Sequence, residues 1–420
     1  MMTSKSKYTE AYVWIWLPNM TEPVVAGKLE QDGNNLLFAY GKSYLDRKEA
    51  IPIYDPELSL NPGTIPLLNG LSAPSCIRDG APDAWGQRVI INRMTGLKGK
   101  AASEIELSLL TYLMESGSDR IGALDFQSSP TNYVPRQSKA APLEELMESA
   151  ELVEKGVPLS RELGQALLHG SAVGGARPKA LIDDDEVKFI AKFSASNDTY
   201  NVVKGEYIAM RLATIAGLHV APVKLIQAVG KDVLLVERFD RTYTTEGWKR
   251  KAIVSALTIL ELDEMMARYA SYEKLAEIIR KRFTEPKETL KELYARMVFN
   301  ILCGNTDDHA RNHAAFWDGK ELTLTPAYDI CPQGRAGGEA TQGMLLVGLN
   351  RFSQLRVCME GAHHFHISEE EARKVIEHQK SVIEDNWDSV CSEAQLSEVD
   401  RALFWHRQFL NPYAFEGLDE

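Results

Sequence analysis

Aromatic and β-branched side chains occur in short runs near the start of the chain. Residues 9–17 and 34–40 have this composition, which predicts strands. A helix is predicted through Trp85 and Ile90. Residues 128–142 then contain three prolines among small polar residues, which is typical of a linker. We therefore place a first domain boundary near this linker.

The hydrophobic pattern after the linker alternates between helices and strands. Residues 143–155 and 160–169 have the spacing of helices. Residues 187–193 alternate well enough to predict a strand. A helix over residues 205–217 and a hairpin over residues 223–239 complete a small sheet-rich lobe.

From about residue 250 onward, apolar residues recur mostly at helical spacing. Leu290, Leu293 and Met297 belong to one such helix, which leads directly into a segment rich in Asp, Asn and His. The predicted order is a small sheet-rich lobe, a short connection near residues 238–241, and a helical lobe that carries the acidic segment.

The composition mainly excludes certain classes of protein. The 420 residues are 44% hydrophobic and 25% charged, which is typical of a globular chain of two or three domains. The formal net charge of −12 argues against broad electrostatic binding of nucleic acid. No apolar stretch suits a transmembrane span or a signal peptide, and the five cysteines form no CxxC pair. We therefore predict a cytoplasmic protein with reduced thiols and no membrane association.

The candidate chemistry is concentrated in residues 304–312 and in Asp329. Asp307 and Asn312 are five residues apart, and Asp329 follows as a further acid. Kinase-fold phosphotransferases space their catalytic base, metal-binding Asn and second metal-binding Asp in this way. Asp307 is therefore the candidate general base, and Asn312 and Asp329 are candidate Mg²⁺ ligands with hard oxygens. With the order of the lobes, this motif predicts an α+β fold of the kinase-like two-lobe type.

Alternatives stay open within this motif. An isolated Asp at the position of Asp307 would more often cap a helix, and the function rests on the set of residues around it. Asp308 competes with Asp307 as the base, and we choose Asp307 because it gives the five-residue offset to Asn312. His309 is a candidate to orient the loop or to contact the nucleotide, and a packed core histidine is an equal alternative.

A glycine-rich segment, residues 169–179, is the candidate phosphate-binding loop. Gly174 and Gly175 would let backbone N–H groups approach phosphates closely, although glycine pairs more often mark turns. Lys179 closes the segment, and Ser171 offers a hydroxyl that could be phosphorylated.

The remaining candidates would bind ATP from the sheet-rich lobe. Lys192, at the end of a predicted strand, would pair with the α- and β-phosphates. Glu206, on the following helix, would hold Lys192 by an ion pair, although either residue alone is more often a solvated charge. The main-chain groups of Glu237 and Phe239 would meet the adenine edge within the connection.

Taken in order, these segments resemble the HipA family of bacterial serine/threonine kinases. The marks of the resemblance are residues 71–86, 119–124, 174–179, 189–193, 206–212, 236–241, 305–312 and 327–330. The resemblance covers nearly the whole chain. It implies an N-terminal α/β subdomain over residues 1–130, a kinase small lobe over residues 131–245 and a helical large lobe over residues 246–420.

The resemblance also implies an activity and its partners. HipA-type kinases use ATP and Mg²⁺ to phosphorylate a protein serine, in some members on an aminoacyl-tRNA synthetase, and so cause growth arrest and persistence. They are the toxins of toxin–antitoxin modules, and HipB, a small helix-turn-helix protein, neutralises them and provides the main contact with DNA. Some members phosphorylate a serine beside their own glycine-rich loop. By matched motif, Asp307 takes the base role, Asn312 and Asp329 the metal roles, and Lys192 the phosphate role.

The chain departs from the family pattern at two places. The family loop often reads Ser-x-x-Gly-Ala-Gln-x-Lys, whereas here Arg177 replaces the Gln and Ser171 lies one residue early, before Ala172. Asp308 stands where a small residue often follows the base. Both departures lie where a target serine would approach, so they bear on the identity of the substrate. Two other interpretations stay open: a small-molecule kinase of the aminoglycoside type, which shares the Asp-to-Asn spacing, and an inactive pseudokinase that acts as a co-repressor.

Overall fold

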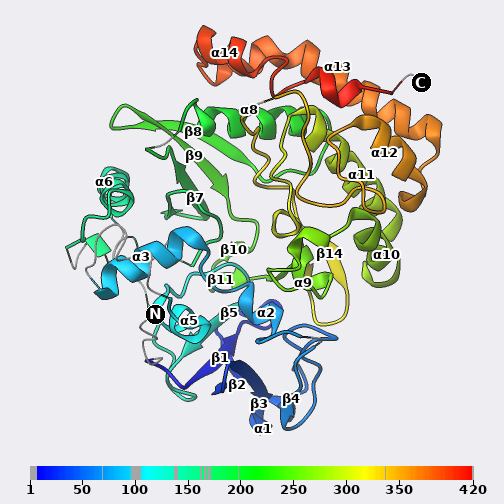
Figure 1. The fold of residues 1–420 in the computed structure, drawn as a ribbon. Helices are drawn as coiled ribbons and strands as arrows, with labels where there is room; N and C mark the ends of the chain where they lie inside the picture. The colour runs from blue at the N-terminus through cyan, green and yellow to red at the C-terminus, as the bar shows by residue number, and fades with distance from the viewer. Residues whose placement is uncertain are drawn as a thin grey trace. The chain divides into compact units, whose positions relative to one another are not determined.

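The computed structural model of the chain describes residues 7–68, 70–95, 106–136, 141–160, 163–164, 167, 172–196, 198–335 and 337–418. The chain forms two compact units (Figure 1). The first unit comprises Met1–Asn197, Ile226–Val254 and Trp317–Lys320. The second comprises Asp198–Leu225, Ser255–Phe316 and Glu321–Glu420. The first unit thus holds both the N-terminal region and most of the predicted small lobe.

An antiparallel sheet organises the N-terminal region of the first unit. Its strands, in the order β4-β3-β2-β1-β5, are β4 (Thr64–Ile65), β3 (Asn35–Tyr40), β2 (Val24–Asp32), β1 (Glu10–Ile15) and β5 (Leu124–Gln127). The β2–β3 hairpin pairs Asp32 with Asn35, and Gly33 in its two-residue turn has a φ of 58°. Among the described residues, this region also contains the helices α1 (Lys42–Leu45), α2 (Ser75–Arg78), α3 (Ala84–Thr95) and α5 (Leu109–Glu115).

A second sheet of the first unit carries the predicted nucleotide-binding residues. Its order is β6 (Lys179–Asp184), β7 (Val187–Phe193), β9 (Lys231–Glu237) and β8 (Val223–Ala228, which enters the first unit at Ile226). Alternate residues of β7 are buried in one hydrophobic cluster with side chains of α3 and of α6 (Leu143–Glu154). The cluster includes Trp85, Val89, Leu146, Met147, Ala150, Phe189, Ala191 and Phe193. A helix of the N-terminal region therefore shares a core with this sheet.

The chain leaves the first unit later than the sequence predicted. We expected the passage to the helical lobe near residues 238–241, but β10 (Arg241–Thr244) and β11 (Gly247–Arg250) form a hairpin that stays in the first unit. The second segment of the second unit begins at Ser255, the last residue of β12 (Ala252–Ser255). The predicted division at residues 130 and 245 stays a prediction.

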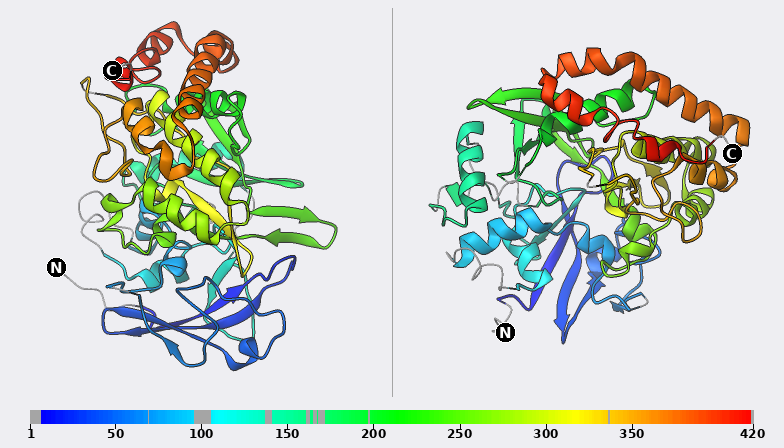
Figure 2. Two further views of the ribbon diagram at one scale, coloured as in Figure 1. Left: turned by 90° about the vertical axis from the view of Figure 1, so that its right-hand side faces the viewer. Right: turned by 45° about the horizontal axis from the view of Figure 1, so that its top comes forward.

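The second unit is mainly helical. Its elements are α8 (Val202–Ile215), α9 (Ala256–Ile259), η1 (Ala267–Tyr269), α10 (Tyr272–Arg282), α11 (Pro286–Leu302), η2 (Ala310–Asn312), β13 (Ala314–Trp317, its last residue in the first unit), β14 (Leu322–Leu324), α12 (Leu355–Gly361), η3 (Ala362–Phe365), α13 (Glu369–Glu393), α14 (Glu398–Phe404) and η4 (Pro412–Phe415). Helix α11 packs against α10 and α13, and α13 packs against α8 (Figure 2). Leu293, Met297 and Ile301 of α11 are fully buried, so α11 is the core helix that positions the loop after it.

Several sequence predictions agree with these elements. The strand over residues 187–193 is β7, and the helix over residues 143–155 is α6. Helix α8 starts at Val202 rather than residue 205, because the Asn201 side chain caps it at the Lys204 N–H. The predicted helix over residues 160–169 lies mostly outside the described residues. Strands after residue 250 were missed, since they are only three or four residues long.

The membrane prediction can be compared only with the helices. Within the part of the chain that the structure describes, no helix combines the length and apolar character needed to cross a bilayer.

Candidate active site

Helix α11 ends at Leu302 and delivers the chain into the acidic loop of the second unit. Gly304 has a φ of 72°, and a Cβ there would lie 2.6 Å from the Gln408 carbonyl oxygen. Only glycine suits this position without displacement of a neighbour. Asn305 then fixes the loop to the helix, because its N–H and side-chain amide donate to Asn300 at 2.8 and 3.0 Å.

The two adjacent acids of the loop have opposite environments. Asp308 is 1% exposed; its Oδ2 accepts a hydrogen bond from the Tyr272 hydroxyl, and its Oδ1 lies 2.7 Å from Nε2 of His313. Asp307 is exposed. Asp308 is thus occupied by internal contacts, and this supports the choice of Asp307 as the group that meets a substrate.

The pKa of the Asp307 carboxyl is raised above its ordinary value. Partial withdrawal of the carboxylate from water is the largest cause, and the nearby charges of Asp329 and Asp308 also raise this pKa, whereas His309 lowers it. The effect of Asp329 on the pKa of Asp307 indicates that the two carboxylates lie in one region of the second unit. A cation there would relieve their repulsion.

Asn312 and Asp329 are both tied to this region. Asn312, the last residue of η2, donates its amide N–H to the Asp307 carbonyl at 3.1 Å, so its amide oxygen is the atom that could bind a metal. The Tyr328 hydroxyl donates to the Arg311 carbonyl at 2.7 Å and fixes the chain just before Asp329. Asp329 itself has a φ of 58°, a left-handed conformation that is uncommon outside glycine and often found at functional sites.

The donor set fits a hard cation that keeps other ligands. No group of three or more His, Cys, Asp or Glu side chains is placed to hold a metal within the described ranges. A Mg²⁺ ion at Asn312 and Asp329 would take its remaining oxygens from phosphates and water, as this ion usually does.

The structure is compatible with both interpretations of His309, a functional residue of the loop and a packed core histidine. The residue is half-buried, and its Nδ1 is buried with no hydrogen-bond partner in the described chain. Its charge lowers the pKa of the Asp307 carboxyl two residues before it. A role in orienting the loop stays a prediction.

The glycine-rich loop lies in the first unit and is held in a folded conformation. The Gly175 N–H donates to Asp83 at 2.7 Å, and Gly175 has a φ of 102°. The Lys179 ammonium donates to the Gly174 carbonyl, and Lys179 is only 3% exposed. A Cβ on Gly175 would collide with that ammonium. In this conformation Lys179 therefore supports the loop from inside it.

Residues of the N-terminal region contact the same loop. The Trp85 indole N–H donates to the Lys179 carbonyl at 3.1 Å, and Arg88 donates to the Ala176 carbonyl at 2.6 Å. The sequence predicted a helix through this segment and a family mark that includes Trp85, but it did not predict the contact with the loop. Ser171 lies outside the described residues.

The other candidate residues are spread over the two units. Lys192 is half-buried on β7, where it pairs with Lys179 of β6 and Leu234 of β9. Glu206 is 3% exposed on α8 of the second unit. Their predicted ion pair would join the two units and stays a prediction.

The predicted adenine contacts lie at the end of β9. Glu237 is the last residue of that strand, and Phe239 follows in the turn before β10. Both residues are partly exposed, whereas Arg238 and Asp240 between and after them are 3% and 2% exposed. This alternation turns the side chains of Arg238 and Asp240 into the first unit.

Two family models match the chain. The HipA N-terminal domain matches residues 17–127, and the HipA-like C-terminal domain matches residues 171–387, which is about half of the chain. The chain belongs to the HipA family. The resemblance proposed from the ordered motifs is therefore confirmed.

Curated relatives of this HipA-family chain are named as kinases. A putative kinase of Sinorhizobium fredii, Y4mE, is 26% identical over 338 residues and covers 73% of this chain and 74% of its own length. The serine/threonine-protein kinase toxin HipA of Shewanella oneidensis is 27% identical over 149 residues, 31% of this chain and 34% of its own length. The predicted serine/threonine kinase of the HipA type is confirmed, and the predicted toxin–antitoxin context is supported.

A solved structure shares the fold. The HipA chain in the Shewanella oneidensis complex of HipA, HipB and operator DNA matches with a TM-score of 0.65 and 17% identity, and covers 95% of each chain. This likeness confirms the predicted α+β fold of the kinase type.

Proposed function

We propose that this HipA-family kinase transfers the γ-phosphoryl group of ATP to a protein serine, with Asp307 as the general base. The contrast between Asp307 and Asp308 carries the proposal. One carboxylate of the pair is exposed beside Asn312, and the other is bonded to Tyr272 and His313 in the interior. Only an exposed carboxylate can reach the hydroxyl of a second protein.

The chain's own groups account for the transfer. The Asp307 carboxylate orients the serine hydroxyl and accepts its proton as the new O–P bond forms and the bond to ADP breaks. A raised pKa makes this carboxylate a better proton acceptor than an ordinary Asp. The Asn312 amide oxygen and the Asp329 carboxylate would hold Mg²⁺, which supplies charge neutralisation at the phosphates.

Most of the proposed nucleotide contacts belong to the first unit, whereas Glu206 belongs to the second. Lys192 on β7 would pair with the phosphates, and Glu206 would orient Lys192. Main-chain N–H groups at Gly174 and Gly175 would cover the phosphates, with Lys179 as the support of the loop. The loop would have to release its internal contacts if the Lys179 ammonium is to reach a phosphate, since that ammonium is bonded to Gly174.

The proposed biological context is a toxin–antitoxin module. The similar HipA chain assembles with HipB and operator DNA. A HipB-like helix-turn-helix partner suits this chain because its net charge of −12 does not favour DNA binding on its own. An aminoacyl-tRNA synthetase is the proposed substrate class, with growth arrest as the consequence.

Label transfer from [γ-³²P]ATP tests the proposal against its alternatives. Label in a lysate protein with wild-type enzyme, and none with Asp307→Ala, supports it. Label only in an aminoglycoside would indicate a small-molecule kinase. Absence of both transfer and ATP binding would indicate a pseudokinase co-repressor.

Autophosphorylation at Ser171 needs its own measurement. Intact mass after incubation with ATP is expected to rise by one phosphate in the wild type and to stay unchanged in Ser171→Ala. An equal phosphate count in both proteins would remove Ser171 from the scheme.

A further inference from the structure

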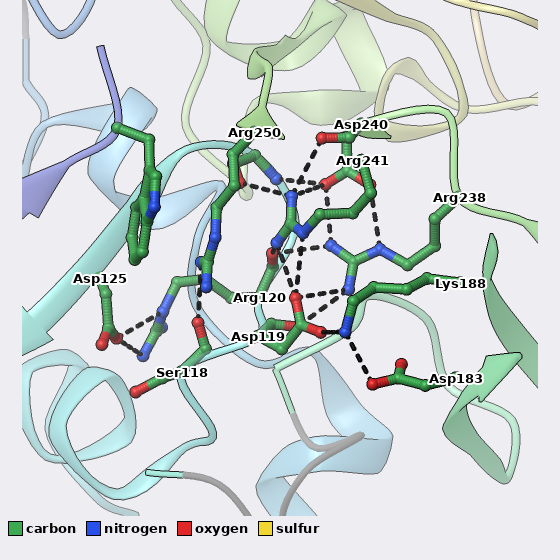
Figure 3. A network of polar contacts seen from close by, with 12 residues as sticks. Ser118, Asp119, Arg120, Asp125, Asp183, Lys188, Arg238, Asp240, Arg241 and Arg250 are labelled. Carbon is green, nitrogen blue, oxygen red and sulfur yellow. Dashed lines mark hydrogen bonds and ion pairs between the residues drawn. The ribbon is translucent and has the colours of Figure 1, made fainter. Parts of the chain in front are cut away.

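A buried ionic network connects the N-terminal region with the end of β9 and the turn after it, which carry Glu237 and Phe239 (Figure 3). We call it the Asp119 network. Its members are Asp119, Lys188, Arg238, Asp240 and Arg241, all in the first unit. Each is between 2% and 8% exposed, so the charges are almost completely removed from water.

Asp119 is the centre of the network. Its Oδ1 accepts hydrogen bonds from Nη1 of Arg238 at 3.0 Å and from Nε and Nη2 of Arg241 at 3.0 and 2.8 Å. Its Oδ2 accepts from the Lys188 ammonium at 2.8 Å. Three cations, from β7, from the β9–β10 turn and from the first residue of β10, therefore converge on one carboxylate of the N-terminal region.

Main-chain groups extend the same connection. The Arg120 carbonyl accepts from Nη2 of Arg238 at 2.9 Å and from Nη2 of Arg241 at 2.5 Å. The Gly122 N–H donates to Asp240 at 2.8 Å, and the Gly122 carbonyl accepts from Arg241 at 3.0 Å. The turn is thus bonded to both the side chains and the backbone of residues 119–122.

The arrangement specifies geometry more than it adds stability. A buried ion pair can be replaced by packed apolar side chains with little loss, because removal of charges from water offsets much of their attraction. Guanidinium–carboxylate bonds, however, are directional, and each fixes the orientation of both partners. Arg238 and Asp240 alternate along the chain with Glu237 and Phe239. Bonds that hold the side chains of Arg238 and Asp240 therefore also hold the main chain at Glu237 and Phe239.

We propose that Asp119 is a positioning residue for the nucleotide: through Arg238 and Arg241 it sets the main chain at Glu237 and Phe239 and so determines the selectivity for adenine. This inference rests on the proposed function, since it takes these two residues as the contacts of the base. The N-terminal HipA domain then acts as a fixed part of the nucleotide site. A shift of the turn would weaken the hydrogen bonds that distinguish adenine from guanine.

A neighbouring ionic cluster provides a matched control. Asp125 is 0% exposed and bonds Arg120 at 3.0 Å and Arg136 at 2.7 Å. The Arg120 guanidinium also donates to the carbonyls of Gly80 and Leu113. In the contacts of the described residues, these side chains bond within the N-terminal region and not to the β9–β10 turn. Asp125→Asn therefore disturbs an equally buried charge without a direct effect on Glu237 or Phe239.

The test compares ATP and GTP binding by calorimetry in Asp119→Asn, Arg238→Lys and Asp125→Asn. In the first two variants we expect the ratio of ATP affinity to GTP affinity to fall by about tenfold, which is equivalent to one weakened hydrogen bond. Asp125→Asn should unfold at lower urea concentration but keep the wild-type ratio. Arg238→Lys keeps the positive charge and loses only the forked geometry, so it carries the test if Asp119→Asn does not fold.

Three results would overturn the inference. One is a wild-type ratio in the folded variants of the Asp119 network, and another is an equal loss of selectivity in Asp125→Asn. The third is failure of both network variants to fold, which would make the network a structural element only. Nucleotide binding measured by calorimetry requires neither a protein substrate nor the general base. A negative result for Asp119 is therefore distinguishable from a negative result for Asp307 as the catalytic residue.

Discussion

The hydroxyl of Tyr272 donates a hydrogen bond to the carboxylate of Asp308 in the interior of the second unit. This bond joins the first residue of α10 to the loop that follows α11. Nε2 of His313 lies near both groups, at 3.1 Å from the hydroxyl and 2.7 Å from the carboxylate. The loop therefore has a buried support directly beneath its exposed acid.

Tyr272→Phe tests this support. Removal of the hydroxyl leaves the buried Asp308 carboxylate one donor short, so the free energy of unfolding should fall by about 1–3 kcal/mol. Urea denaturation measures the change. ATP affinity should stay at the wild-type value, because Tyr272 is not among the proposed nucleotide contacts. An unchanged unfolding midpoint would mean that the bond contributes nothing to stability.

Asp307→Asn should reduce activity and leave stability unchanged. The exposed side chain contributes little to folding, so the urea midpoint should stay within error of the wild type. Phosphoryl transfer should fall by about 10²- to 10⁴-fold, because an amide cannot accept the proton of the serine hydroxyl. Rates from labelled ATP give the measurement. A variant that retains near-normal kcat would exclude Asp307 as the base.

Asp329→Asn tests the metal site. Loss of one carboxylate should lower transfer at fixed Mg²⁺ by on the order of a hundredfold and shift the Mg²⁺ titration to higher concentration. A Mg²⁺ titration of initial rates checks this, with Asp318→Asn, an exposed acid, as the control. Identical titration curves for Asp329→Asn and the wild type would rule out Asp329 as a ligand.

Gly304→Ala should damage the loop through its backbone. At a φ of 72°, with the Gln408 carbonyl oxygen 2.6 Å from a new Cβ, the substitution should cost about 1–3 kcal/mol. Gly338→Ala is the control, since a Cβ there meets nothing within 4 Å. Urea midpoints and transfer rates should fall for Gly304→Ala only. Equal midpoints for the two variants would contradict the requirement for glycine.

The buried carboxylates of the Asp119 network and of the neighbouring Asp125 cluster predict a dependence of stability on pH. Burial would raise the pKa values of Asp119, Asp240 and Asp125, but the neighbouring arginines lower all three below the ordinary range. Such groups bind protons more weakly in the folded chain, so their stabilisation is present above the unfolded pKa of about 3.9 and is lost as pH falls below it.

Urea denaturation at a series of pH values measures this effect. The unfolding free energy should change little between pH 7 and 5 from these groups and fall steeply below about pH 4. Asp125→Asn should show a shallower fall than the wild type. A wild-type curve that is flat down to pH 3 would contradict the lowered pKa values.

Local sequence patterns were sufficient to predict several helices and strands and to identify the acidic motif. Strand β7 and helix α6 have clear periodicity, and the five-residue offset identified Asp307 and Asn312 because both lie in one short loop. Spacing could not explain Asp308, since its burial depends on Tyr272, a residue of another helix. The sequence offered only one sign of it, the departure from a small residue after the base.

The sequence also could not predict the long-range ionic contacts. Residues 119–124 and 236–241 were both recognised as family marks, but nothing in either segment indicated that they bond to each other. Such a pairing arises only when β9 and the N-terminal region are folded in three dimensions. The same reason explains why the connection was expected near residue 241, whereas the β10–β11 hairpin keeps the chain in the first unit.

The shared core of α3 and β7 has a consequence for how this protein can be divided. Trp85 is fully buried and donates to the Lys179 carbonyl, so a fragment that starts at the linker would lack both its packing and its hydrogen bond. Phe189, Ala191 and Phe193 belong to the same buried cluster, which would lose Trp85 and Val89. The N-terminal domain is thus not a removable module, and truncation, domain exchange or recombination at the linker would separate two halves of one folding unit.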